Sequence, residues 1–464
     1  RLVQTYALSP ELRAMSHVWA AADDGTQVVA AKGSPEAVVD LCHLDAAAQA
    51  HIAAAVDTLA ADGLRVLAVA EARFAGAHWP AGEHDFDFRF VGLLGLSDPL
   101  RSQVPAAIAE CRAAGIRVLM ITGDYPVTAR AIALQAGLID ANAAAGQGAW
   151  LLSGDELATL DDAALRERMA TVSVCARIAP EQKLRIVQAL KARGEVVAMT
   201  GDGVNDAPAL RAAHVGIAMG RRGTDVAREA ASLVLLDDDF SAIVRAVRVG
   251  RRIFDNLRNA MSYILAVHVP IAGMALLPVL LGWPTLLYPM HIALLQLIID
   301  PACSLAFEAE AADAGVMQRP PRDAVAPLFG GATLRLALLQ GLGALGLVLV
   351  AYAWAGTRLP ETSARAFAFA TLVVANLALI LSNRSASATL WATLRTPNTT
   401  LWAVLSFALA LLLAALYLPW AMAVLRFAPL PAGDLALAVA LGLLGLVWFE
   451  GVKRLRRGAS AAPR

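Results

Sequence analysis

Charged residues are scarce in this sequence of 464 residues. Only 17% of the residues are charged, 58% are hydrophobic, and the mean hydropathy is +0.57. Ordinary soluble domains carry about 25% charged residues, so a purely soluble protein is excluded. Lysine plus arginine and aspartate plus glutamate both total 39. This balance leaves no excess of positive charge to attract nucleic acid, and we expect no nucleic-acid partner.

Cysteine is scarce as well, and no Cys-x-x-Cys pair occurs. The four cysteines stand singly, at Cys42, Cys111, Cys175 and Cys303. This spacing argues against a disulfide framework and a zinc site, and it fits a reducing compartment. The sequence begins with Arg1 rather than methionine and shows no signal-peptide pattern, so we interpret it as a piece of a longer protein.

Six long apolar stretches occur after residue 260. Each is about long enough to cross a hydrocarbon core of about 30 Å, which takes roughly 20 helical residues. The predicted spans are Met261–Gly282, Leu286–Phe307, Leu334–Ala355, Ala366–Leu381, Leu401–Ala421 and Leu435–Phe449. Buried helices of a large soluble protein are the alternative, which the number of spans disfavours. We therefore expect a multi-pass protein in a lipid bilayer.

Basic residues orient these spans. Arginine or lysine precedes the first span, lies between the second and third and between the fourth and fifth, and follows the sixth. Because loops rich in lysine and arginine stay on the cytosolic side, both ends of the chain are predicted to be cytosolic. The richness in alanine, arginine and leucine suggests a bacterial cell (inner) membrane.

The sequence before residue 259 alternates between strand and helix patterns. Apolar runs that predict strands are Arg117–Ile121, Val196–Met199, Val215–Met219 and Ser232–Leu236. Helical stretches are Val104–Ala114, Pro126–Ala136 and Glu181–Arg193. This alternation is typical of a parallel sheet with helices on its faces. Ligands bind at the carboxyl ends of such strands, where the sequence Thr-Gly-Asp occurs twice, at 122–124 and at 200–202.

Residues 1–90 have a different pattern. Apolar runs at Val28–Ala31 and Val66–Ala70 flank an alanine-rich helical stretch, Ala46–Ala61. We expect a small α+β domain ahead of the parallel sheet.

The most informative segment is Thr200–Leu210, which reads TGDGVNDAPAL. Two carboxylates, Asp202 and Asp206, and the amide of Asn205 follow a buried strand on a glycine-rich turn. Mg²⁺ prefers such hard oxygen ligands together with phosphate oxygens. A turn in which Asp and Asn only bond their own backbone is the alternative, which the length of the pattern disfavours.

This segment resembles the hinge signature of P-type cation-transporting ATPases of the calcium-pump type. Further motifs of that family occur in the family's order: KGSPE at 32–36, DPLR at 98–101, MITGD at 120–124 and RIAPEQK at 177–183. The resemblance covers nearly the whole chain. It implies an α/β fold plus an all-α membrane bundle: a partial α+β nucleotide-binding domain at 1–92, a haloacid dehalogenase-like (HAD-like) phosphorylation domain at 93–258 and six transmembrane helices at 259–464.

The resemblance also implies roles for single residues, with ATP and Mg²⁺ as cofactors. Lys183 would supply a positive charge to the transferring phosphoryl group, and Asp202 and Asp206 would form the Mg²⁺ site. Polar contacts to phosphate would come from Thr122, Gly123 and Asn205, and Thr122–Asp124 would meet the dephosphorylating domain. ATP would be bound by Lys32, Gly33, Arg65 and Arg101.

One family feature is missing. No DKTG occurs in the 464 residues, so the aspartate that is phosphorylated in the family is absent, and so are the actuator domain and the first four membrane helices. We expect the HAD-like domain to lack its first strand and its nucleophile. The missing N-terminal portion of the same pump is the predicted partner, and the chain alone is predicted to be inactive.

Polar residues inside the spans indicate a transported cation. Charged groups there cost about 2.5–3.5 kcal/mol on insertion scales, so they are functional candidates. The second span carries Gln296 and Asp300, the fourth Asn376, and the first His268. Prolines next to two of these residues, Pro270 and Pro301, predict interrupted helices with free carbonyls.

A divalent ion, Ca²⁺ or Mn²⁺, is our leading prediction for the cargo because residues 308–322 resemble calcium-type pumps. A single carboxylate is few ligands for Ca²⁺, so a proton or a monovalent cation is the alternative. A membrane protein whose HAD-like domain only binds or regulates is the alternative from a different functional class.

Overall fold

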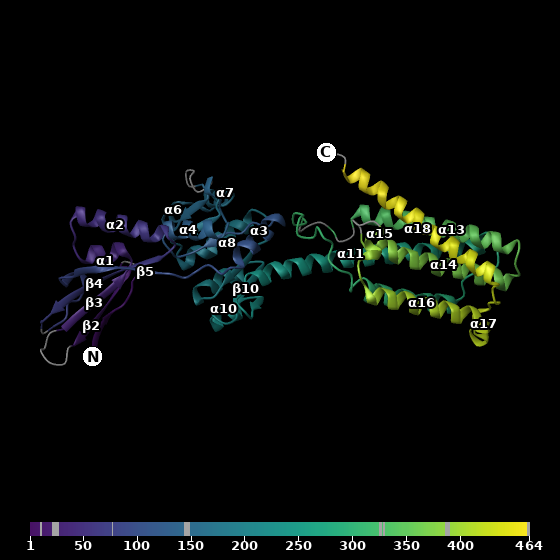
Figure 1. Ribbon diagram of the computed structural model, residues 1–464, viewed down its shortest axis with the longest axis horizontal. Coiled ribbons are helices and arrows are strands. Elements are labelled where there is room, and N and C mark those ends of the chain that lie inside the picture. Colours follow the sequence, from purple (N-terminus) through teal and green to yellow (C-terminus); the bar gives the residue numbers. More distant parts are fainter. Residues whose placement is uncertain are drawn as a thin grey trace. The chain divides into compact units, whose positions relative to one another are not determined.

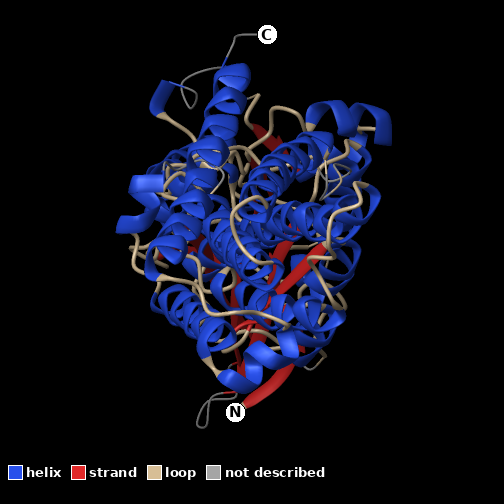
Figure 2. Ribbon diagram, turned by 90° about the vertical axis from the view of Figure 1, so that its right-hand side faces the viewer, coloured by secondary structure: helices blue, strands red, loops and turns tan. Residues whose placement is uncertain are grey.

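The computed structural model describes residues 1–9, 12–20, 27–76, 78–142, 149–323, 327, 330–385 and 390–461. The chain divides into two compact units, Arg1–Val244 and Arg245–Arg464, which are traced in sequence colours in Figure 1. All strands that the described residues form lie in the first unit, and helices predominate (Figure 2). The domain boundaries at 92 and 258 stay predictions.

The first part of unit one is an antiparallel sheet covered by two helices. Its strands pair in the order β1-β2-β3-β4-β5, and the helices α1 and α2 lie on one face of the sheet (Figure 1). The elements are β1 (Leu2–Tyr6), β2 (Ala14–Ala20), β3 (Gln27–Gly33), α1 (Pro35–Leu41), α2 (Ala46–Ala61), β4 (Arg65–Phe74) and β5 (Arg89–Leu96). Small buried residues such as Val29, Ala31 and Ala70 allow the helices to pack closely on the strands. The predicted α+β domain is confirmed.

The ends of helix α2 follow from its sequence. Asp45 precedes the helix, and its carboxylate accepts a hydrogen bond from the backbone of Ala48 at 2.8 Å. This N-cap satisfies one of the free amides of the first turn. The helix then covers the predicted range Ala46–Ala61.

The second part of unit one contains parallel strands in two groups of three. The orders are β6-β8-β7 and β9-β10-β11, and every pair is parallel. The strands are β6 (Met120–Ile121), β7 (Leu151–Ser153), β8 (Val174–Ala176), β9 (Ala198–Gly201), β10 (Val215–Met219) and β11 (Leu233–Leu235). The helices are α3 (Val104–Ala113), α4 (Pro126–Gln135), α6 (Gly154–Thr159), α7 (Asp162–Arg168), α8 (Pro180–Ala192), α9 (Ala207–Ala212) and α10 (Asp225–Ala230). The expectation of parallel strands separated by helices is confirmed.

Both groups of strands share one hydrophobic core. Buried residues of β8 and β9, such as Cys175 and Met199, belong to the same cluster as Ile186 and Leu190 of α8. Burial raises the pKa of the Cys175 thiol to about 12, so this cysteine is an inert part of the core.

The strand predicted at Arg117–Ile121 is much shorter in the structure. Only Met120 and Ile121 form β6, and they pair with β8 alone. Strand β9 likewise pairs only with β10. A strand is stabilised by ladders with its neighbours, and among the described residues no strand pairs with the other edge of β6 or of β9. Because its partner β8 spans only three residues, β6 has few ladder partners beyond Met120 and Ile121.

Unit two consists of helices, and six of the described helices are long and apolar enough to cross a membrane. They are α11 (Ser241–Leu280), α12 (Pro289–Pro301) continued by the π-helical turn η3 (Ala302–Ala306), α13 (Gly331–Gly356), α14 (Glu361–Asn383), α16 (Thr399–Tyr417) and α18 (Ala432–Ala461). Two short helices complete the unit, α15 (Leu390–Arg395) and α17 (Pro419–Leu425). The prediction of six spans is confirmed, although the fifth ends at Tyr417 instead of Ala421.

Large apolar side chains cover the outside of this bundle. Val350, Trp420 and Val447 are each 69–70% exposed, which would be costly in water but suits lipid. Helix α14 is the central helix, because most of its residues are buried. The protein is therefore an integral, multi-pass membrane protein.

The predicted interruption of the first span at Pro270 is wrong. Helix α11 runs through Pro270 and Pro278 without a break. Proline has no N–H group, so the carbonyl of the residue four positions earlier loses its usual donor. For Pro270 this is the carbonyl of Ala266. Gly341 of α13 lies against that carbonyl so closely that a Cβ on it would be 2.6 Å from the oxygen. Close packing of a neighbouring helix keeps a proline-containing membrane helix intact.

Gly33 offers a test of the packing in the antiparallel sheet. A Cβ at this position would lie 2.5 Å from the carbonyl oxygen of Arg13 and from the Cα of Ala14, both backbone atoms. We expect Gly33→Ala to destabilise the full-length protein by about 1–3 kcal/mol and to lower its thermal unfolding midpoint without ATP. Gly92→Ala is the control, because nothing lies within 4 Å of a Cβ there. Equal midpoints for the two variants would contradict this packing.

Candidate functional site

The Thr-Gly-Asp turn after β6 is held by its own side chains. The Thr122 hydroxyl donates to the Asp124 carboxylate at 2.8 Å and accepts from the Asp124 backbone at 3.1 Å. The backbone amides of Arg177 and Ile178 donate to the carbonyls of Asp124 and Thr122, both at 3.1 Å. The turn is therefore tied to the segment that leads into α8, and Gly123 is exposed.

Asp206 organises the second turn, which follows β9. This carboxylate is only 5% exposed, and one of its oxygens accepts hydrogen bonds from the backbone amides of Asp202 (3.2 Å) and Gly203 (3.1 Å). Its other oxygen lies 2.6 Å from the ammonium group of Lys183 on α8. A buried carboxylate requires such partners. Asp206 thus shapes the loop and holds Lys183 at the end of β9.

Asp202 and Asn205 have a different environment. Both side chains are exposed, and no described residue bonds the Asp202 carboxylate, whose backbone carbonyl accepts from Thr224 at 2.8 Å. The described residues contain no group of three His, Cys, Asp or Glu side chains arranged to hold a metal. Mg²⁺ commonly takes one or two carboxylates and completes its shell with phosphate and water. The open carboxylate of Asp202 fits that donor set.

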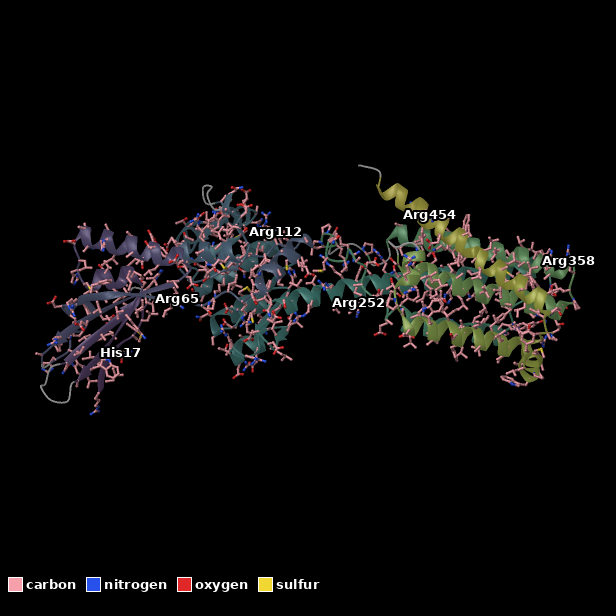
Figure 3. All side chains as sticks on the ribbon, viewed as in Figure 1. His17, Arg65, Arg112, Arg252, Arg358 and Arg454 are labelled. Atoms are coloured by element: carbon pink, nitrogen blue, oxygen red, sulfur yellow. The ribbon has the colours of Figure 1, made fainter. Side chains whose placement is uncertain are left out.

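The residues predicted to bind ATP lie in several places. Lys32 is exposed near the end of β3, while Gly33 is buried against the start of β2. Arg65 starts β4 and is 70% exposed, with its Nε 3.8 Å from Asp124; Figure 3 labels it at the end of the sheet next to the HAD-like part. Arg101 donates to the carbonyl of Asp238. Binding of ATP by these four residues stays a prediction.

Arg177 joins the two parts of unit one, which sequence reasoning missed. Its guanidinium bonds Glu36 at 2.5 Å and lies 5.1 Å from the centre of the Tyr125 ring. Arg177 also has a positive φ of 53°. Glu36 belongs to the motif at 32–36 and Arg177 to the motif at 177–183. Nothing in the sequence indicates that these two residues, 141 positions apart, form an ion pair.

Asp238 is a second residue that sequence reasoning missed. Its carboxylate accepts hydrogen bonds from the backbone amides of Arg221 (3.0 Å) and Arg222 (3.1 Å), which tie the turn before α11 to the loop after β10. Burial on its own would raise the pKa of Asp238, but these bonds, a further one from Gly220 and the charge of Arg101 lower it. Asp238 is therefore an ionised carboxylate that holds the loop after β10 next to the start of α11.

The predicted cation ligands differ in how deeply they are buried. His268, Gln296 and Asp300 have exposed side chains, and a ring nitrogen of His268 lies 2.7 Å from the carbonyl of Ile264. Asn376 is 1% exposed, and neither its amide oxygen nor its nitrogen has a partner. A buried amide without partners is costly, so Asn376 stays a candidate for binding a ligand.

The backbone after Asp300 is irregular, as Pro301 predicts. Helix α12 ends at Pro301 and continues as the π turn η3, and the Ser304 hydroxyl donates to the Asp300 carbonyl at 2.8 Å. Single π turns inside helices are frequent at functional sites. The regular α-helical hydrogen-bond spacing therefore ends directly after the exposed Asp300.

Comparison with protein families agrees with this geometry. Residues 13–214 match the haloacid dehalogenase-like hydrolases, and residues 284–455 match the family described as cation-transporting ATPase, C-terminus. The chain belongs to the P-type cation-transporting ATPases. The family predicted from the motifs is confirmed, and with it the HAD-like fold followed by a membrane bundle.

Curated P-type ATPases give the same result. A probable cation-transporting ATPase F of Mycobacterium tuberculosis is 42% identical over 393 residues, which cover 79% of this chain and 42% of that protein. A calcium-transporting ATPase of Listeria monocytogenes is 38% identical over 65% of this chain and 34% of its own length. One of Bacillus subtilis is 39% identical over 70% and 36%. The chain thus spans less than half the length of these relatives.

The ion pair of Asp206 leads to a test. We expect Asp206→Asn in the full-length ATPase to lower the rate of ATP hydrolysis by about 10²–10³-fold, as removal of one preorganised charge contact does elsewhere. The amide cannot hold Lys183 by charge. Asp162→Asn is the matched control, because this 87% exposed carboxylate pairs with Arg185 of the same helix α8 and such surface pairs contribute little. Equal rates for the two variants would show that Lys183 needs no partner.

Proposed function

We propose that the chain is the ATP-hydrolysing and cation-binding C-terminal part of an ATP-driven cation pump. The observation that carries this proposal is the arrangement at the end of β9: Lys183 held by a buried Asp206, beside the open carboxylate of Asp202. A module that only binds or regulates has no need of a complete phosphate site. The six apolar helices supply the membrane part that a pump requires.

Lys183 and Asp202 have different roles at the proposed phosphate site. Asp202 would hold Mg²⁺, which neutralises phosphate charge when bound. Lys183 places a positive charge beside the transferring phosphoryl group, and its fixed position avoids reorganisation during the reaction. Thr122, Gly123 and Asn205 are the neighbouring groups that we assign to phosphate contacts. The share of Asp206 in the metal site stays a prediction, since both of its oxygens already have partners.

A preceding segment of the same pump would supply the phosphorylated aspartate. The free edges of β6 and β9 are suited to accept one more parallel strand. That strand would end between the two Thr-Gly-Asp turns and place its aspartate beside Lys183. The actuator domain and the first four helices belong to the same proposed segment.

We assign ATP binding to the exposed residues Lys32 and Arg65, and to Gly33 and Arg101. Arg65 lies near Asp124, so a nucleotide bound on the antiparallel sheet would have a cation directed toward the HAD-like part. The contact between Arg177 and Glu36 supports this assignment, because it also connects the antiparallel-sheet part with the HAD-like part.

The transported cation is proposed to bind at Asp300, Gln296 and Asn376, with His268 near the path. Relatives named calcium-transporting ATPases favour a divalent ion. Asp300 is the single carboxylate between Met261 and Phe307, which makes a proton or a monovalent cation the second candidate. We assign both ends of the chain to the cytosol of a bacterial cell, because loops rich in lysine and arginine favour the cytosolic side.

The ion is tested with the full-length pump reconstituted in vesicles. We expect one ion of a panel of Ca²⁺, Mn²⁺, Mg²⁺, Na⁺ and K⁺ to stimulate ATP hydrolysis, and Asp300→Asn to reduce that stimulation at least about tenfold. Asp434→Asn makes the same chemical change at the start of α18 and should have no effect. A rate that depends only on pH would favour protons. A rate indifferent to ions, pH and Asp300 would contradict a pump.

A further inference from the structure

A buried carboxylate, Glu310, lies four residues beyond the π turn η3. It is 6% exposed, and its two oxygens accept hydrogen bonds from the Arg384 guanidinium at 2.8 and 2.9 Å. The side-chain amide of Asn398 donates to the same carboxylate at 2.9 Å. Asn256 of α11 donates to the Glu310 carbonyl, also at 2.9 Å. Glu310 is therefore bonded to three separate parts of the bundle.

Arg384 extends these connections. Its remaining N–H groups donate to the carbonyls of Thr393 (2.8 Å) and Thr396 (3.2 Å), which lie between α14 and α16. Its own carbonyl accepts from Asn259 of α11 at 3.0 Å. With its side chain 2% exposed, this guanidinium is buried and donates four hydrogen bonds to protein oxygens. A lysine could not reproduce this planar set of bonds.

Asn398 connects the ion pair to the π turn. Its amide oxygen accepts from the Leu401 backbone at 2.8 Å and so caps helix α16. Its amide nitrogen donates to Glu310 and to the carbonyl of Ala306, the last residue of η3, at 3.2 Å. One side chain therefore fixes the end of the irregular segment that begins directly after Asp300 and Pro301.

Burying an ion pair is an expensive way to stabilise a helix bundle, since apolar residues of similar volume do as well or better. Here the Glu310–Arg384 pair, together with Asn398, fixes the position of the segment that contains η3. We propose that Glu310, Arg384 and Asn398 are positioning residues that hold the π turn, and so set the orientation of Asp300 and of the carbonyls that follow it. This inference rests on the proposed function of Asp300.

The deciding variant is Asn398→Ser. Serine caps α16 about as well as asparagine, but its short side chain cannot reach both Ala306 and Glu310. Outer partners of metal ligands typically change ion affinity by about 10–100-fold. We expect this variant of the full-length pump, in vesicles with Ca²⁺ or Mn²⁺, to need a 10–100-fold higher ion concentration for half-maximal ATP hydrolysis. The maximal rate at saturating ion should be unchanged.

Two further variants complete the experiment. Glu310→Gln should shift half-maximal activation in the same direction, because it removes the charge that orients Arg384. Glu450→Gln is the matched control: this carboxylate is 14% exposed, pairs with Lys453 of α18 at 3.0 Å and accepts from the Ser382 hydroxyl of α14 at 3.0 Å, and no described residue of η3 bonds it. It should leave half-maximal activation as in the wild type.

An unshifted half-maximal concentration in Asn398→Ser would overturn the inference. So would a loss of maximal rate and thermal stability without a shift, because a purely structural role produces that result. Asp300→Asn, measured alongside, separates this failure from failure of the proposed function. If Asp300→Asn abolishes the ion response while Asn398→Ser does not shift it, only the positioning role is wrong.

Discussion

The ion pair between Lys183 and Asp206 is the interaction on which the proposed phosphate site depends. Asp206 is buried and uses one oxygen for Lys183 and the other for the backbone of its own turn. The same residue therefore fixes a loop that follows β9 and a cation that comes from α8. Without it, the turn and the lysine would be free to move apart, and the positive charge would have to be brought back to the phosphate at each turnover.

The carboxylates of the chain fall into two kinds. Asp206 and Glu310 are buried, and protein donors occupy both of their oxygens. Asp202 and Asp300 are exposed, and no described residue bonds their carboxylates. Asp202 lies in the turn that Asp206 holds through the backbone. Asp300 precedes the π turn η3, whose last residue is bonded by Asn398, a partner of Glu310. The proposed phosphate site and the proposed cation site thus each combine a buried, hydrogen-bonded carboxylate that fixes positions with an exposed carboxylate that binds.

Much of this could be predicted from the sequence because the informative signals are local. The cap at Asp45 and the alanine-rich run give α2, and the apolar run Val215–Met219 becomes β10 with the same bounds. The six spans follow from length and hydropathy alone. The motifs at 122–124 and 200–206 lie at the ends of β6 and β9, although β9 begins two residues later than the predicted strand Val196–Met199.

The rest depends on partners far away in the chain. Strand β6 is short because its partner β8, more than 50 residues away in the chain, spans only three residues. Helix α11 passes through Pro270 because Gly341 lies against it. The pairs Arg177–Glu36 and Arg384–Glu310 join residues 141 and 74 positions apart. No local pattern encodes such a pair, so only the folded structure reveals it.

The central claim is that this chain builds the surroundings of a phosphorylated aspartate that lies in a preceding segment. It is tested most directly by measuring protein-bound phosphate after incubation with ATP and Mg²⁺, for the 464-residue chain alone and for the full-length pump. The account predicts acid-stable, hydroxylamine-labile phosphate on the full-length pump only. Such phosphate on the 464-residue chain alone would contradict it.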